Sequence, residues 1–144
     1  MTVLFSDDAA EGRVLILRYN DATFGLQSVA SLYAPATGIA DRIAWLEQLP
    51  WQLLQHAFVG TDANTTLARH ERSDYHKPLP QCGVRLAELL AQWRLTDAWT
   101  NSDVEDEQPI ARATFTTKDS WSCLDRIFVP TLLTEHLAHI ATLD

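Results

Sequence analysis

The hydrophobic period of the chain changes near its middle, and this change constrains the fold more than any other feature. Apolar residues recur at helical spacing over residues 39–49, and Pro50 ends the run. A short apolar segment, Gln55–Val59, then predicts a buried strand that leads into the polar sequence Gly60–Asn64. Because a helix followed by a buried strand is the unit of an α/β protein, we expect polar side chains at the carboxyl end of a sheet strand, where such sheets hold their sites.

Asp62 and Asn64 are the candidate functional residues of that stretch. In an extended segment, residues two positions apart share a face, so both side chains are expected to point into one pocket. An aspartate can bind a metal ion or act as a general base, and an asparagine can hold a phosphate oxygen. The alternative is an ordinary turn, because Asp and Asn are common turn residues.

The other expected elements surround this stretch, and their boundaries come from alternation, helical spacing, and proline or glycine breaks. Polar loops are expected over residues 65–82 and 101–110. The expected strands are Val3–Phe5, Arg13–Tyr19, Leu26–Tyr33, Ala113–Thr117 and Ser122–Val129, and the further expected helices are Gly83–Trp93 and Leu132–Ile140.

Composition predicts one globular domain, because 144 residues suffice for one hydrophobic core. No apolar run approaches the roughly 20 residues that span a bilayer, and the first residues lack the basic start of a signal peptide. We therefore expect an intracellular protein of the nucleus or cytoplasm without membrane association. Cys82 and Cys123 lack Cys-x-x-Cys spacing, which favours buried thiols, with a single disulfide as the alternative.

The net charge argues against a simple nucleic-acid role. Eleven Lys and Arg residues against nineteen Asp and Glu residues give −8, and such a surface repels polyanions. Phosphate binding normally uses clustered basic residues. A nucleic-acid site in this chain would therefore need local groups, with a cation among them, to overcome the overall field.

Several short motifs follow one another in a fixed order between about Gly12 and Pro130. They are Leu32-Tyr33-Ala34-Pro35 after a hairpin, a helix that carries Arg42, Gly60-Thr61-Asp62-Ala63-Asn64, Asp97-Ala98-Trp99 after Leu89–Trp93, Thr114-Phe115, and Ser122-Cys123-Leu124-Asp125-Arg126-Ile127. In this order and spacing they resemble the endonuclease/exonuclease/phosphatase superfamily, and within it the endonuclease domains of LINE-type (non-LTR) retrotransposons.

The resemblance implies an α/β (α+β) fold, a partial four-layer αββα sandwich of the DNase I-like type. In that fold two mixed sheets pack face to face with helices outside. Its members hydrolyse phosphodiester or phosphomonoester bonds with Mg²⁺. DNA is the implied partner, and residues 1–144 would form a single, incomplete domain.

Four residues match functional positions of the family, and their roles are implied by the resemblance. Asp62 matches the aspartate that orients or deprotonates the attacking water, and Asn64 matches the asparagine that hydrogen-bonds the phosphate; these two are also the implied Mg²⁺ ligands. Tyr33 matches the tyrosine whose hydroxyl reaches the phosphate. Asp125 matches the aspartate that holds the catalytic histidine in its working tautomer. The alternative for Asp125 is a strand-edge acid paired with Arg126 or with another nearby cation.

Other family motifs lack a counterpart. An early Asn and a metal-ligating Glu are missing, and the final Ser-Asp-His would begin about where the chain stops. Ser73-Asp74-Tyr75-His76 is similar to that triplet but has an inserted tyrosine and comes too early. Ser31 and Ala36 stand where asparagines are usual. The resemblance therefore implies the C-terminal two-thirds of a nuclease domain, a truncated fragment of a mobile element.

Three functions follow as expectations. The first is a Mg²⁺-dependent phosphodiesterase that nicks DNA but is inactive without the missing segments. The second is a non-catalytic remnant, which the absent Glu and His and the −8 charge favour. The third is a phosphatase acting on a small phosphorylated molecule, which suits an acidic surface better than duplex DNA does.

Two further expectations concern metals and stability. A zinc site of His70, His76 and Cys82 is disfavoured, because structural zinc sites use more closely spaced pairs. Loss of the first strands of a sandwich would leave a sheet edge and a core face uncovered. We therefore expect the isolated chain to aggregate or to unfold in part.

Overall fold

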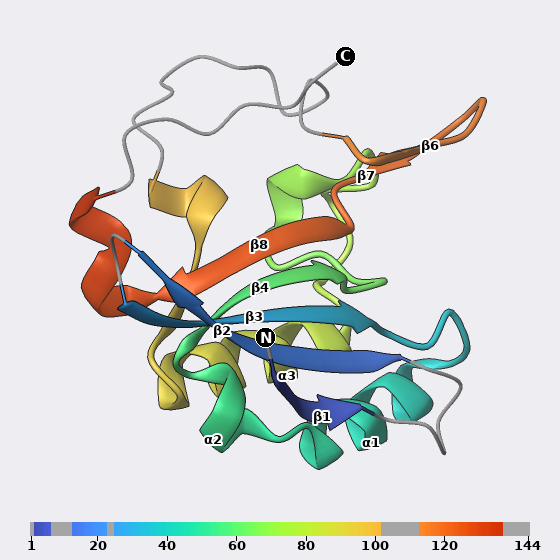
Figure 1. The fold of residues 1–144 in the computed structure, drawn as a ribbon. Helices are drawn as coiled ribbons and strands as arrows, with labels where there is room; N and C mark the ends of the chain where they lie inside the picture. Colours follow the sequence, from blue (N-terminus) through green and yellow to red (C-terminus); the bar gives the residue numbers. More distant parts are fainter. Residues whose placement is uncertain (1, 7–12, 23–24, 102–112, 137–144) are drawn as a thin grey trace.

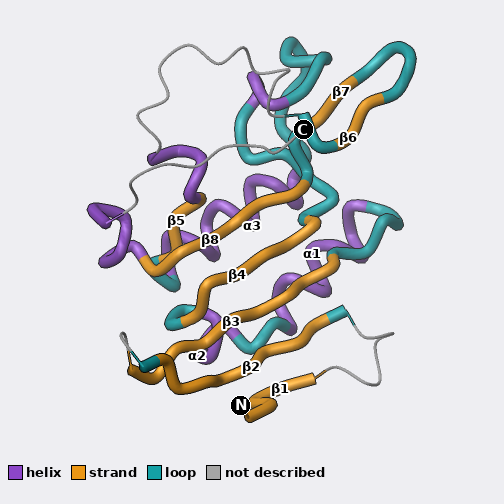
Figure 2. Tube along the Cα trace, turned by 45° about the horizontal axis from the view of Figure 1, so that its top comes forward, coloured by secondary structure: helices purple, strands orange, loops and turns teal. Residues whose placement is uncertain are grey.

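A computed structural model describes residues 2–6, 13–22, 25–101 and 113–136. Its centre is a six-stranded mixed sheet in the order β1-β2-β3-β4-β8-β5, whose strands are seen side by side in Figure 2. A separate two-stranded hairpin projects beyond the sheet. The sheet strands are β1 (Thr2–Ser6), β2 (Val14–Asp21), β3 (Gly25–Tyr33), β4 (Ala57–Asp62), β5 (Leu95–Asp97) and β8 (Asp125–Pro130), and the hairpin strands are β6 (Phe115–Thr116) and β7 (Trp121–Ser122).

Three α-helices lie on one face of the sheet (Figure 1). The helices α1 (Ile39–Gln48) and α2 (Trp51–Leu54) connect β3 to β4, and this crossover allows the two strands to pair in parallel. Proline cannot continue a helix, and Pro50 separates α1 from α2. After α3 (Gln81–Gln92) and β5, the late strand β8 pairs antiparallel with both β4 and β5. Short 3₁₀ turns occupy Arg69–Glu71 (η1), Ala98–Asn101 (η2) and Thr131–His136 (η4).

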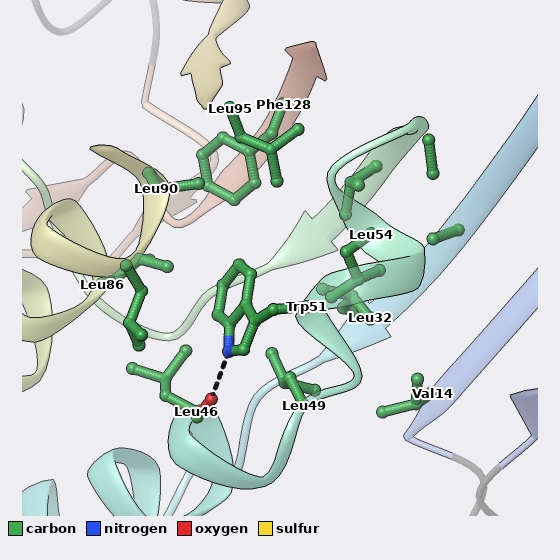
Figure 3. Packing of buried hydrophobic residues seen from close by; sticks show 14 of the residues in the cluster. Val14, Leu32, Leu46, Leu49, Trp51, Leu54, Leu86, Leu90, Leu95 and Phe128 are labelled. Carbon is green, nitrogen blue, oxygen red and sulfur yellow. Dashed lines mark hydrogen bonds between the residues drawn. The ribbon is translucent and has the colours of Figure 1, made fainter. Parts of the chain in front are cut away.

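The hydrophobic core lies between these helices and the facing side of the sheet. Alternate residues of β2 and β4, such as Ile16 and Val59, point into it and are almost completely buried. Trp51 fills the space between the helices and the sheet, and its indole N–H donates a hydrogen bond to the Leu46 carbonyl at 2.8 Å (Figure 3). This bond satisfies the polar end of a buried aromatic side chain.

The other side of the sheet carries a second apolar surface. Strand register aligns its members in two rows across β2, β3, β4 and β8. Leu15, Phe58 and Ile127 on it are 38%, 36% and 47% exposed. Among the described residues, no α-helix covers this side. The open face, as we call it, consists of Leu15, Leu17, Val29, Phe58 and Ile127.

The structure confirms both long predicted helices and the N-terminal strands, and it corrects two other predictions. The expected turn at Gly60–Asn64 is wrong in its first half, because β4 continues through Asp62. The single strand expected over Ser122–Val129 is divided into β7 and β8. The division has a physical cause: between them the Cys123 and Leu124 N–H groups bond the Glu71 carbonyl and the Thr114 hydroxyl instead of a strand.

Four other expected segments are shorter in the structure, contain regular elements, or lie partly outside the described residues. The strand expected over 113–117 is reduced to β6, and the expected loop over 65–82 contains η1 and the first turn of α3. The last expected helix is a 3₁₀ turn as far as His136, and its remainder, like the acidic stretch after Asn101, lies outside the described residues. The described mixed sheet and its helices form an α/β arrangement.

Candidate functional site

Four polar side chains follow one another across one end of the sheet. Strand register pairs Tyr33 with Asp62, and Asp62 with Asp125. Arg13, just before β2, accepts the Tyr33 N–H at its carbonyl at 2.9 Å. Because directly opposed residues on neighbouring strands share a face, these four side chains form one polar row at the edge of the open face. We call Arg13, Tyr33, Asp62 and Asp125 the polar row.

Backbone hydrogen bonds fix the strand ends that carry the row. The Ala34 N–H donates to the Asp62 carbonyl at 2.9 Å, and the Ala63 N–H donates to the Leu124 carbonyl at 2.9 Å. The three strands β3, β4 and β8 therefore remain joined up to the last residue of β4. A rigid strand end places a side chain more accurately than a loop does.

Asn64 lies beyond the strand end in a left-handed conformation, with φ of 46°. Its backbone N–H donates to Asp62 Oδ1 at 2.9 Å, and its side-chain Nδ2 donates to the Ala34 carbonyl at 2.7 Å. The extended geometry that the sequence argument assumed through Asn64 is therefore wrong, because the backbone turns after Asp62. In this conformation Asn64 orients the Asp62 carboxylate and ties the end of β3 to the turn.

Asp125 is held through its backbone. The Thr114 hydroxyl oxygen accepts the N–H groups of Leu124 and Asp125 at 2.9 and 3.0 Å. The alternative that Asp125 pairs with Arg126 finds no support, since alternation points the Arg126 side chain to the opposite face, where its guanidinium bonds other carboxylates. Asp125 is exposed on the same face as Asp62.

A buried ion cluster lies on the core side of the same strand end. The Arg126 guanidinium donates to both oxygens of Glu71, at 3.1 and 2.5 Å, to the Asp97 carboxylate, and to the Cys123 carbonyl at 3.1 Å. The side chains of Arg126 and Asp97 are 1% and 3% exposed. This cluster joins β8, β5 and the loop after β4, so it holds the floor of the site in place.

The two buried charges of this cluster respond differently to their surroundings. Burial raises the pKa of the Asp97 carboxyl, although Arg126 and the Trp99 N–H oppose that shift. Burial by itself lowers the pKa of Arg126, but the ion pairs with Glu71 and Asp97 outweigh it and raise that pKa. One guanidinium serves two carboxylates, and Asp97 is the more deeply buried of them.

Sequence reasoning did not identify this cluster. The available signal was an arginine at an inward position of an alternating strand, between Asp125 and Ile127. A buried arginine requires a paired carboxylate. The partners, however, are 29 and 55 residues away, and no local pattern links them to Arg126.

A hollow of about 340 Å³ opens beside the polar row. Its walls include the two aspartates of the polar row, Trp99, and the small residues Ser31 and Gly60. Tyr33 and Asn64 do not line it. Six of its lining residues are Ser31, Gly60, Asp62, Trp99, Thr114 and Asp125.

The two carboxylates of the row are oxygen donors of the kind that Mg²⁺ prefers. Within the described residues, however, no three His, Cys, Asp or Glu side chains gather as a metal site would require. The donors therefore fit the ion in type and supply part of a ligand set. Asp62 and Asn64, the predicted ligands, are joined by the Asn64 N–H bond to Asp62 Oδ1. The side-chain nitrogen of Asn64, however, donates to the Ala34 carbonyl.

Other sequence expectations concern the cysteines and membranes. Cys82 and Cys123 are both free and buried, which confirms the expected thiols. The Cys82 thiol donates to the Thr65 hydroxyl at 3.3 Å. None of the helices in the described ranges is both long enough and apolar enough to cross a bilayer.

Comparison with known proteins identifies a similar fold. No family model matches the sequence, and no curated protein matches it. A solved structure, the endonuclease domain of TRAS1, a telomere-specific non-LTR retrotransposon, superimposes with a TM-score of 0.58 at 12% sequence identity. The match covers 86% of this chain and 53% of that chain, so the chain spans about half the length of the structure it resembles.

Proposed function

We propose that this chain is part of a Mg²⁺-dependent phosphodiester hydrolase domain of the retrotransposon endonuclease type, with DNA as its substrate. The observation that carries the proposal is the adjacent pair Asp62 and Asp125 on neighbouring strands, with Tyr33 beside them in the polar row. The similarity of the fold to a retrotransposon endonuclease domain supports it. The sequence motifs that led to the same family contain these three residues.

In this proposal, three side chains of the polar row have a task in phosphodiester hydrolysis. Asp62, oriented by the Asn64 N–H, accepts a hydrogen bond from the attacking water and takes its proton. The Tyr33 hydroxyl donates to a phosphate oxygen, which carries more charge in the transition state. Asp125 would hold a catalytic histidine in its working tautomer, and the described residues do not place that histidine at the row. A bound Mg²⁺ would polarise the phosphate, with Asp62 and Asp125 as the carboxylates nearest to hold it.

Residues 1–144 form, in this proposal, a single incomplete domain and a partial αββα sandwich. The open face supports this, because it is an apolar sheet surface of the kind that a second sheet covers. The coverage of about half of the TRAS1 structure supports it as well. We therefore propose that the missing Asn, Glu and Ser-Asp-His motifs belong to segments that complete the domain.

A plasmid-nicking assay with and without Mg²⁺ tests the proposal. We expect no nicking by residues 1–144 alone and Mg²⁺-dependent nicking by a protein extended with the segments that carry the missing motifs. In the extended protein, Asp62→Ala should reduce nicking about 10²- to 10⁴-fold, since this is what a positioned base contributes. Asp119→Ala, in the exposed turn between β6 and β7, is the matched control and should nick like the wild type. Nicking that survives Asp62→Ala would overturn the assigned roles.

Two other functions have specific support. A non-catalytic remnant is favoured by the −8 charge and the partial ligand set, and an absence of nicking by the extended protein at every Mg²⁺ concentration would support it. A phosphatase for small molecules is favoured by the same charge. It would hydrolyse p-nitrophenyl phosphate faster than bis(p-nitrophenyl) phosphate, whereas a phosphodiesterase would show the reverse order.

A further inference from the structure

Residues 69–77, which follow β4 in the chain, concentrate basic side chains in an otherwise acidic protein. Five basic residues fall within this stretch, whereas the whole chain holds eleven Lys and Arg and five His. They are Arg69, His70, Arg72, His76 and Lys77, and we call residues 69–77 the basic segment. A polyanion meets the least repulsion where positive groups gather, so this segment is the favoured approach for one.

The two acidic side chains of the basic segment are already paired. Both oxygens of Glu71 accept hydrogen bonds from the Arg126 guanidinium, at 3.1 and 2.5 Å. The Asp74 carboxylate accepts Arg72 Nε and lies 3.1 Å from Lys77 Nζ. The carboxylates are therefore neutralised by cations, and the basic segment keeps a net positive charge.

Arg69 is the arginine of the segment that is available to a ligand. Its side chain is exposed, and it forms no hydrogen bond or ion pair with any residue that the structure describes. It begins η1, the lime-green turn beside β7 in Figure 1. A guanidinium carries a planar set of donors that matches the oxygens of a phosphate, so a phosphate that reaches this turn meets donors that are not in use.

Hydrogen bonds hold the basic segment against the chain that leads into β8. Glu71 Oε2 accepts the Ala68 N–H at 2.8 Å, and the Glu71 carbonyl accepts the Cys123 N–H at 2.9 Å. The Ser73 N–H donates to the Trp121 carbonyl at 3.0 Å, and the Trp121 N–H donates to the Ser73 hydroxyl at 3.2 Å. These bonds fix the backbone of the segment relative to β8, and so relative to the polar row.

We infer that the basic segment binds the phosphate backbone of DNA that extends beyond the polar row, with Arg69 as the contacting residue. This inference rests on the proposed function. Consecutive Cα atoms lie about 3.8 Å apart, so the bond between Glu71 and Cys123 keeps the Cα atoms of Arg69 and Asp125 within about 20 Å of each other. This span is about six base steps at about 3.4 Å each. A duplex with one phosphate at Asp125 therefore has another within reach of Arg69.

Arg94 provides a matched control for this inference. It is also exposed, and within the described ranges its side chain likewise forms no hydrogen bond or ion pair. It lies just before β5, which pairs with the end of β8 opposite to Asp125. Arg69→Gln and Arg94→Gln each remove one positive charge. If Arg69 is an ordinary solvated side chain, the two variants should bind DNA alike, and only a local phosphate contact makes them differ.

The experiment measures binding of a fluorescein-labelled DNA duplex to residues 1–144 by anisotropy, in EDTA, over a series of salt concentrations. We expect Arg69→Gln to weaken binding about tenfold at low salt, as for loss of a charge-assisted hydrogen bond, and to reduce the salt slope by about 1. Arg94→Gln should leave the slope unchanged, and Arg69→Lys, which keeps the charge, should keep it too. Equal slopes for Arg69→Gln and Arg94→Gln would overturn the inference.

A second measurement uses the extended protein and two substrates. Arg69→Gln should raise the KM for plasmid nicking and leave the hydrolysis of bis(p-nitrophenyl) phosphate unchanged, because this small diester does not reach the turn. An equal loss of activity on both substrates would overturn the inference.

Two outcomes separate this inference from the proposed function. If the wild-type chain binds no duplex while the extended protein nicks DNA and Asp62→Ala does not, the inference alone fails. If the extended protein does not nick DNA but Arg69→Gln still weakens duplex binding more than Arg94→Gln does, the proposed hydrolase fails and the DNA-binding surface stands.

Discussion

Asn64 shows that a backbone angle, as well as a side-chain type, shapes this site. Its left-handed conformation is one that Asn and Gly adopt more readily than other residues. Its two hydrogen bonds orient Asp62 and tie the turn to the end of β3. An asparagine at this position therefore suits the left-handed turn as well as contact with a phosphate.

Substitutions at Asn64 separate the backbone contribution from the side-chain contribution. Asn64→Gly loses the bond to the Ala34 carbonyl but keeps the left-handed angle, so we expect a loss of about 1 kcal/mol in the free energy of unfolding. Asn64→Ala should lower the free energy of unfolding by about 1–2 kcal/mol more, because the alanine backbone is strained in the left-handed conformation. Urea unfolding of the three proteins measures both terms. Equal losses in the two variants would show that the left-handed turn does not persist in solution.

Asp97 gives the protein a specific dependence of stability on pH. Because burial raises its pKa in the folded state, the folded protein binds this proton more tightly than the unfolded chain does. The contribution of this bound proton to the free energy of unfolding is therefore present in full below the unfolded pKa of about 3.9. It is lost as the pH rises through the folded pKa.

The variant Asp97→Asn should remove that dependence. We expect the free energy of unfolding of the wild type to fall relative to that of Asp97→Asn as the pH rises from about 4 towards 7. Urea titrations of both proteins across this range measure the difference. If the free energy of unfolding of the wild type instead rises relative to that of Asp97→Asn, the ion pair with Arg126 affects the pKa of Asp97 more than burial does.

At the scale of elements, the sequence predicts those helices and strands that a local hydrophobic period determines. The helices α1 and α3 follow from apolar spacing, and the break between α1 and α2 follows from Pro50. The alignment of Tyr33, Asp62 and Asp125 could be expected only through the family resemblance, because strand register across β3, β4 and β8 is a long-range property. The Arg126 cluster and the turn at Asn64 depend on contacts that local patterns do not specify.

The packing at the start of α3 could not be predicted from the sequence either. Gly83 lies in the first turn of the helix, where a Cβ would meet the Thr66 carbonyl oxygen at 2.2 Å and Thr65 Oγ1 at 3.1 Å. The missing side chain therefore lets α3 approach the segment after β4. This approach also brings Cys82 to Thr65.

The variant Gly83→Ala should reverse the usual helix preference. Replacing Gly by Ala inside a helix normally stabilises it by about 1 kcal/mol. Here we expect a loss of about 1–3 kcal/mol from overpacking. Gly38→Ala is the control, because a Cβ there would lie 3.8 Å from Asp41 Oδ2, an ordinary contact. Thermal melts decide the matter, and a Gly83→Ala protein that melts above the wild type would refute the close approach.

At the scale of the whole molecule, the open face determines how the chain behaves in solution. Its apolar rows lie on a sheet whose other side is fully packed, and exposed apolar patches of this kind promote association. This agrees with the expectation that the isolated chain aggregates, which stays a prediction. Charge repulsion at −8 opposes association.

A lysine on the open face should therefore improve solubility. We expect Phe58→Lys to reduce self-association in sedimentation velocity, with a change in the free energy of unfolding of about 0.5 kcal/mol or less, as for an exposed position. Val84→Lys, at an exposed apolar position on α3, is the control and should leave association unchanged. Similar behaviour of both variants would show that the open face is not the source of association.

The position of β8 between β4 and β5 has a consequence for synthesis on the ribosome. This strand belongs to the C-terminal part of the chain, yet it separates two strands made earlier and supplies Asp125 to the row. In a nascent chain, β5 has no described strand partner and Asp62 has no neighbouring carboxylate until residue 130 has left the exit tunnel. The pair Asp62 and Asp125 therefore forms only after β8 has emerged, and a product that ends before β8 lacks it.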